Sequence, residues 1–86
     1  MSEQGSEQAR AAIVKAIDNQ LADGEPPETA ETLDRLLEEG YTRDEAYRLI
    51  GCAIADEMFQ IMMHEREFDG ARYIRLLQNL PRLPWE

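Results

Sequence analysis

A long segment between residues 43 and 66 contains no proline and carries apolar side chains on more than one side. It opens with Thr42 followed three residues later by Glu45, which is the pattern of a helix capping box. A helix that is hydrophobic nearly all round is usually buried on several sides, so the segment predicts a long central helix. Gly51 and Ala55, one turn apart within it, predict that another helix approaches closely at this point.

Apolar residues recur at helical spacing in three further segments, which predict three more helices. Gly24 and Gly40 follow the first two of them, where glycine takes the left-handed conformation that ends a helix. The last helix begins after Asp69, a good N-cap residue. No segment alternates as a strand does. The expected helices cover residues 7–22, 27–39, 43–66 and the stretch from Asp69 to Leu80, and together they predict an all-α fold, a small four-helix bundle.

The chain has 86 residues, of which 43% are hydrophobic, and these values suit one small globular domain. A folded chain of this mass has an accessible surface of about 5,200 Å². The small polar residues at the start predict a disordered N-terminus over residues 1–6. Residues 7–86 are then expected to form a single helical domain.

The last residues read LPRLPWE and contain the only tryptophan of the chain. Pro81 cannot continue a helix, so an extended tail is expected beyond it. We expect this tail to fold back and to pack Leu83 and Trp85 over the open end of the bundle. The spacing of Pro81 and Pro84 also fits a ligand of aromatic-grooved domains, so binding of the tail to a partner is the alternative.

Most of the net charge of −9 lies between Asp23 and Glu45, a stretch with nine acidic and two basic residues. Affinity for nucleic acid depends on neutralising phosphates, so direct nucleic-acid binding is not expected. No segment has the length of uncharged apolar sequence that a membrane span needs. Cys52 is the only cysteine and the first residues lack the pattern of a secretory signal, which together favour the cytoplasm.

Few residues in the chain favour catalysis. His64 is the only histidine, and a metal-dependent or hydrolytic accessory site would have to combine it with Glu57 and Glu67. Cys52 has apolar helical neighbours, which is typical of an inert buried thiol. Glycine-rich phosphate loops and zinc-binding spacings do not occur in the sequence. We therefore expect no enzyme activity, cofactor or bound metal, and keep the site around His64 as an alternative.

The second half of the central helix is rich in methionine and includes Met58, Phe59, Met62 and Met63. Methionine-rich surfaces can bind partner helices, but in a central helix these side chains are first expected to belong to the core. Any face that the other helices leave bare would bind a partner or a second copy. The candidate interaction surface comprises Met58, Met62, Leu83 and Trp85.

Two stretches, GYTRDEAYRLIGCAIADEMF and EFDGARYIRLLQNLP, together resemble a group of short bacterial all-helical proteins of uncharacterised function. The residues that carry the resemblance are Gly40-Tyr41, Asp44-Glu45-Ala46, Phe68-Asp69 and Arg72-Tyr73. The resemblance implies a small helical domain and no known activity. Some members of the group carry histidines near the positions of Ile13 to Ala16 and Arg48, and their absence here weakens a metal site further.

The sequence thus predicts a non-enzymatic cytoplasmic module for protein–protein interaction or regulation. Its partner would be an unknown protein or a second copy in a homodimer. Besides the metal-dependent site around His64, one more alternative is an acidic mimic of nucleic acid, with the helix over 27–39 as the mimic face.

Overall fold

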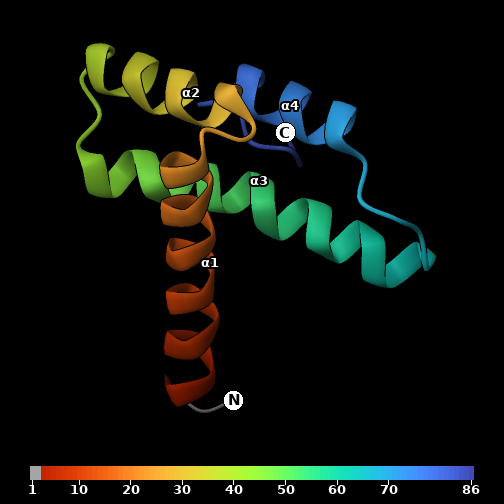
Figure 1. Ribbon diagram of the computed structural model, residues 1–86. Helices are drawn as coiled ribbons and strands as arrows, with labels where there is room; N and C mark the ends of the chain where they lie inside the picture. The colour runs from red at the N-terminus through yellow and green to blue at the C-terminus, as the bar shows by residue number, and fades with distance from the viewer. Residues whose placement is uncertain (1–2) are drawn as a thin grey trace.

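The computed structural model describes residues 3–86, which form four helices: α1 (Glu3–Asp23), α2 (Pro27–Glu38), α3 (Arg43–His64) and α4 (Gly70–Asn79). The described residues contain no strand, which confirms the all-α class. α2 and α4 lie side by side along α3, whereas α1 crosses α3 steeply and extends beyond the other helices (Figure 1). α3, the longest helix, packs against each of the other three, as expected of the central helix, and α2 does so as well.

Two of the helix boundaries differ from the expected ones by more than one residue. α1 begins at Glu3, so residues 3–6 are helical although they were expected to belong to a disordered N-terminus, and residues 1–2 lie outside the described part of the chain. α3 ends at His64, slightly before the expected end at residue 66.

Local sequence signals determine most of the helix ends. The capping box is present, because the Glu45 backbone N–H donates to Thr42 Oγ1 at 3.1 Å and the Thr42 N–H donates to Glu45 Oε1 at 2.9 Å. The side chain of Asp69 accepts from the Arg72 N–H at 3.0 Å at the start of α4. Gly40 has a φ of 102° at the end of α2, where only glycine adopts this conformation without strain.

The core lies between one face of α3 and the facing sides of the other helices. On α3 the fully buried apolar positions recur every three or four residues, which places them on one side of the helix. α1 contributes only one fully buried apolar residue, so it is the least enclosed of the four helices. The core consists of Ile17, Leu33, Leu36, Ala46, Ile50, Ala53, Ile54, Tyr73, Leu77 and Leu80.

α1 and α3 touch closely at Gly51, as expected from its place in the central helix. A Cβ atom at this position would lie 3.0 Å from Cγ2 of Ile13, a distance that is shorter than almost all real contacts. Glycine therefore allows the two helices to cross at this point, and this contact offsets the cost of a glycine within a helix.

The side-chain oxygen of Gln20 and the guanidinium of Arg35 connect α2 and α4 to their neighbours. Thr29 Oγ1 and Tyr73 Oη both donate to Gln20 Oε1, at 2.6 and 2.9 Å, and so link three helices inside the core. Arg35 donates to the carbonyl oxygens of Leu80 at 2.6 Å and of Leu77 at 3.1 Å. The guanidinium thus caps the C-terminal end of α4, where a positive charge is favourable.

The C-terminal tail differs from the expectation in its tryptophan. Leu83 and Pro84 are half-buried, but Trp85 is 65% exposed. The interpretation of Trp85 as a lid over the core is therefore wrong. Leu80, which is 1% exposed, closes this end of the core instead.

Replacing Trp85 by alanine is expected to change the free energy of unfolding by less than about 0.5 kcal/mol, because the indole is mostly in solvent already. Leu80→Ala is the matched control and should cost about 2–5 kcal/mol through the cavity that it leaves. Urea denaturation of both variants measures the two values. A loss of 2 kcal/mol or more for Trp85→Ala would restore the lid.

Glu65 follows α3 with a φ of 47°, in the left-handed region that disfavours residues with a Cβ atom. Relief of roughly 1–2 kcal/mol of left-handed strain exceeds the roughly 0.5–1 kcal/mol of conformational freedom that glycine loses on folding, so Glu65→Gly should raise the free energy of unfolding by up to about 1 kcal/mol. Glu67→Gly, two residues further along, relieves no such strain and is expected to be neutral or destabilising. Thermal unfolding of the two variants tests the difference, and equal effects would contradict it.

Candidate functional site

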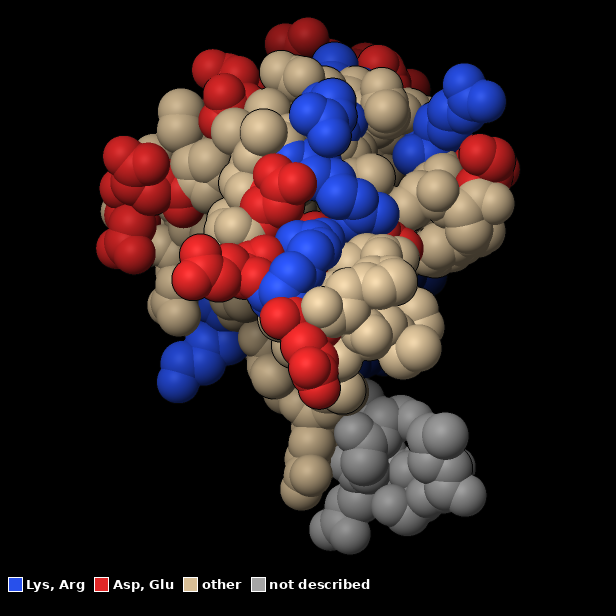
Figure 2. Space-filling view, turned by 90° about the vertical axis from the view of Figure 1, so that its right-hand side faces the viewer, with Lys and Arg blue, Asp and Glu red and all other residues tan. Residues whose placement is uncertain are grey.

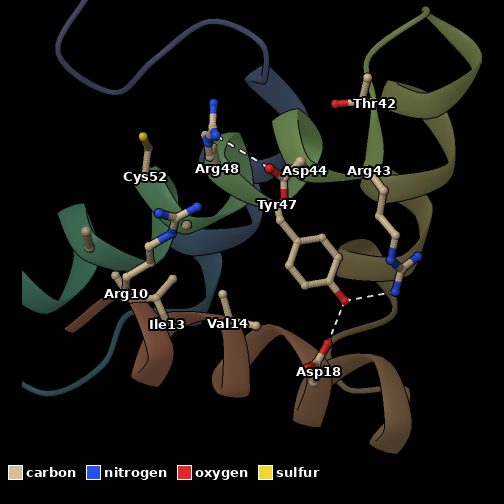
Figure 3. Close-up of a pocket in the computed structure, with 12 residues that line it drawn as sticks. Arg10, Ile13, Val14, Asp18, Thr42, Arg43, Asp44, Tyr47, Arg48 and Cys52 are labelled. Atoms are coloured by element: carbon tan, nitrogen blue, oxygen red, sulfur yellow. Dashed lines mark hydrogen bonds and ion pairs between the residues drawn. The ribbon is translucent and has the colours of Figure 1, made fainter. Parts of the chain in front are cut away.

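A groove runs between α1 and the first half of α3, with a volume of about 1260 Å³ (Figure 3). Apolar side chains of both helices form its floor, because α1 crosses α3 at Gly51 and diverges from it on either side of the crossing. Basic and acidic residues stand along its edges. The α1–α3 groove is lined by Arg10, Ile13, Val14, Asp18, Thr42, Arg43, Asp44, Tyr47, Arg48, Gly51, Cys52 and Ala55.

Tyr47 spans the groove at one end and links the two helices. Its hydroxyl donates to Asp18 Oδ1 at 2.6 Å and accepts from Arg43 Nη2 at 3.0 Å (Figure 3). The Arg43 guanidinium also lies over the Tyr47 ring, 5.0 Å from its centroid. Burial and the Asp18 carboxylate raise the pKa of Tyr47, so the phenol stays protonated and keeps this hydrogen bond. The contact adds a polar link between α1 and α3.

The edges of the groove are more basic than the rest of this acidic chain. The lining contains three basic residues and two acidic ones, which leaves a local excess of one positive charge. They are Arg10, Arg43 and Arg48, and Asp18 and Asp44. Arg48 pairs with Asp44 at 3.4 Å, and both side chains are largely exposed, so the pair contributes little.

The second half of α3 carries a row of large apolar side chains in solvent. Met58 is 53% exposed, Phe59 55%, Met62 76% and Met63 61%. These four residues, here called the α3 strip, were first expected in the core, and that expectation is wrong. The buried face of α3 turns toward α2 and α4, and helical spacing places the strip on the other side.

The groove and the strip form one surface. Gly51, Ala55, Met58 and Met62 follow one another at intervals of three or four residues and therefore lie along one line on α3. The groove floor at Gly51 and Ala55 thus continues directly into the methionines. No other described helix covers this line beyond its crossing with α1.

Of the four residues in the predicted interaction surface, the structure brings Met58 and Met62 together on the strip. Leu83 and Trp85 belong to the tail that follows α4, and only Trp85 of these two is exposed. The groove itself was missed by the sequence analysis, since the residues of α1 and α3 that line it share no local motif.

Neither Cys52 nor His64 has a partner that would make it reactive. Burial raises the pKa of the Cys52 thiol, so little of the nucleophilic thiolate forms near neutral pH. His64 is exposed at the end of α3. Within residues 3–86, no three His, Cys, Asp or Glu side chains come together in an arrangement that could hold a metal ion.

Glu57, the proposed third member of a metal site, is engaged by two arginines instead. It is 2% exposed and accepts from Arg66 at 2.8 and 2.9 Å, from Arg72 at 2.9 Å and from the Asp69 N–H at 2.8 Å. Arg72 also pairs with Asp56. Basic and acidic side chains lie next to one another in a band on the face shown in Figure 2. The pairs of Arg72 with Asp56 and Glu57 join α4 to α3.

Of the acidic residues of α2, Glu31, Asp34 and Glu38 are exposed, whereas Glu28 is half-buried. The nucleic-acid mimic that was considered for this helix stays a prediction. No helix among the described residues combines the length and the apolar character that crossing a membrane requires.

Comparison of the chain with protein-family models, with curated proteins and with solved structures gave no match. The resemblance to short bacterial helical proteins therefore stays a prediction as well.

Glu57→Gln should lower the free energy of unfolding by about 3–5 kcal/mol at neutral pH, because it leaves Arg66 and Arg72 without their buried carboxylate. The hydrogen bonds from Arg66 are the main reason that the pKa of Glu57 falls to about 2. A lowered pKa stabilises the fold above the ordinary value of 4.5, and this stabilisation is lost as the pH falls toward 2.

Chemical denaturation between pH 7 and pH 2 measures this effect. The difference between the wild type and Glu57→Gln should shrink steadily below pH 4.5. Glu67→Gln, at an exposed position, is the control and should differ little from the wild type at any pH. A difference for Glu57→Gln that does not depend on pH would contradict the role of the ionised carboxylate.

Proposed function

We propose that the protein is a non-enzymatic interaction module of the cytoplasm, which docks a helix of its partner against the outward side of α3. The observation that carries the proposal is the exposure of Met58, Phe59, Met62 and Met63 in one row that continues the floor of the α1–α3 groove. The cytoplasm suits a chain whose single thiol, Cys52, has no internal disulfide partner.

The size of the exposed row supports a binding role. A fully exposed side chain of this size offers roughly 200 Å², so the α3 strip presents on the order of 500 Å² of largely apolar surface. This value reaches the upper range for the largest apolar patch on a soluble monomer, and such patches are often functional.

The shape of the surface supports a helix as the docked element. Amphipathic helices bind in apolar grooves through side chains spaced by three, four and seven residues, and the row on α3 has the same spacing. Methionine side chains are flexible and polarisable, so they adapt to the side chains of a partner helix. The arginines and aspartates at the edges of the groove would pair with charged residues of that helix.

The chemistry of the same surface supports a role without catalysis. Cys52 has a raised pKa, and the groove lining includes no histidine that could act as its base. Tyr47 and Asp18 are committed to the hydrogen bond that holds α1 against α3.

Site-specific photo-crosslinking in the native cell tests the proposal. A photoreactive phenylalanine at position 62 should give a covalent adduct with another polypeptide, because Met62 is exposed on the strip that is proposed to bind the partner. The same residue at Asp34, exposed on the outer side of α2, is the matched control and should give none. Adducts that are absent at position 62, or equal at the two positions, would reject the proposal.

A further inference from the structure

The first half of α1 is the second uncovered element of the molecule. The side chains of residues 7–12 are all exposed, and those of α1 that pack on the bundle begin at Ile13. Figure 1 shows this half standing clear of the other helices. These residues bury little surface within one copy, so a second packing surface would stabilise them.

Both uncovered elements lie on the same side of α3. α1 leaves α3 at the contact between Ile13 and Gly51, and the row that contains the α3 strip begins at Gly51. The projecting half of α1 and the strip therefore form the two arms of an open corner. Two copies can therefore dock reciprocally, with the α1 arm of each copy in the open corner of the other.

From these two surfaces we infer that the docked helix is α1 of a second copy, in a closed two-fold dimer. This inference rests on the proposed function and names its partner. One chain carries both the projecting helix and the surface that receives it, so a two-fold axis buries each pair of surfaces twice. The dimer is closed, so it leaves no free copy of the contact surface to which a third chain could add.

The distribution of charge favours α1 of a second copy as the helix that docks on the strip. Between Glu7 and Lys15 the chain has one acidic and two basic residues, whereas the whole chain carries −9. The strip itself contains no charged residue, and the segment that follows it, Glu65-Arg66-Glu67, has two acidic residues and one basic one. The α1 arm, which has an excess of one positive charge, thus meets a surface that is apolar and mildly acidic at its far end, while the strongly acidic α2 of each copy stays outside the contact.

The exposed area agrees with a dimer as well. The accessible surface is 5957 Å², compared with about 5,200 Å² for a compact chain of this mass. The excess is close to the roughly 800 Å² that each partner buries in an interface of standard size. The projecting half of α1 carries part of this excess, and the proposed dimer would bury it.

Analytical ultracentrifugation of the intact chain is the first test, with concentrations up to about 100 μM, above the micromolar limit of interfaces of this size. The wild type should sediment as a dimer of the 9.9 kDa chain. Met62→Glu on the strip and Val14→Glu on α1 should each raise the dissociation constant at least tenfold. Leu37→Glu, at an exposed apolar position on α2, should leave it unchanged, and circular dichroism confirms that each variant is folded.

Crosslinking of mixed copies tests the geometry. Val14→Cys and Met62→Cys are each made with Cys52→Ser, and a short bismaleimide is added to either variant alone and to their mixture. A covalent dimer should form mainly in the mixture, since the proposed contact joins α1 of one copy to the strip of the other. A dimer that forms as well with Met62→Cys alone would indicate strip-to-strip contact and overturn the proposal.

Two further outcomes separate this inference from the function on which it rests. A wild-type chain that remains monomeric throughout overturns the second copy as the occupant. If the photo-crosslink at position 62 in the cell then joins a different protein, the docking function stands and only its partner changes. If the cell also gives no adduct, both proposals fail.

Discussion

α3 is buried along one side and, at Gly51 alone, beneath α1 on the opposite side, and the remainder of the structure depends on this limit. Ala46, Ile50, Ala53, Ile54 and Glu57 share the buried side, which α2 and α4 cover together with the C-terminal half of α1. Three helices of this size cannot enclose a helix that is apolar nearly all round. The uncovered methionines and the proposed docking surface follow from this geometry, as does the projecting arm of α1.

A buried carboxylate holds the other end of the bundle. Glu57 pairs with Arg66 and Arg72 and accepts a hydrogen bond from the backbone at the start of α4. These contacts hold the segment that connects α3 to α4. The cost of burying this charge is offset by four hydrogen bonds from charged or backbone donors. The same hydrogen bonds engage both oxygens of Glu57, so a metal ion would have to displace them to bind there.

Much of the fold could be predicted from the sequence, because helix boundaries depend on neighbours along the chain. The capping box at Thr42, the N-cap at Asp69 and the left-handed Gly40 are local features of this kind. The site could be predicted only in part. Apolar content marked Met58 and Met62 as candidates, but their exposure depends on which faces of α3 the other helices cover.

The sequence by itself determined four helices, their order, the central place of α3 and the close approach at Gly51. Each of these depends on residue type, spacing or backbone conformation, which act within a few turns of the chain. Only the tertiary structure decided that Trp85 lies in solvent, that Glu57 faces two arginines and that the groove meets the strip. The physical reason is that burial and ion pairing depend on distances between segments far apart in sequence, and the packing angles of the helices set those distances.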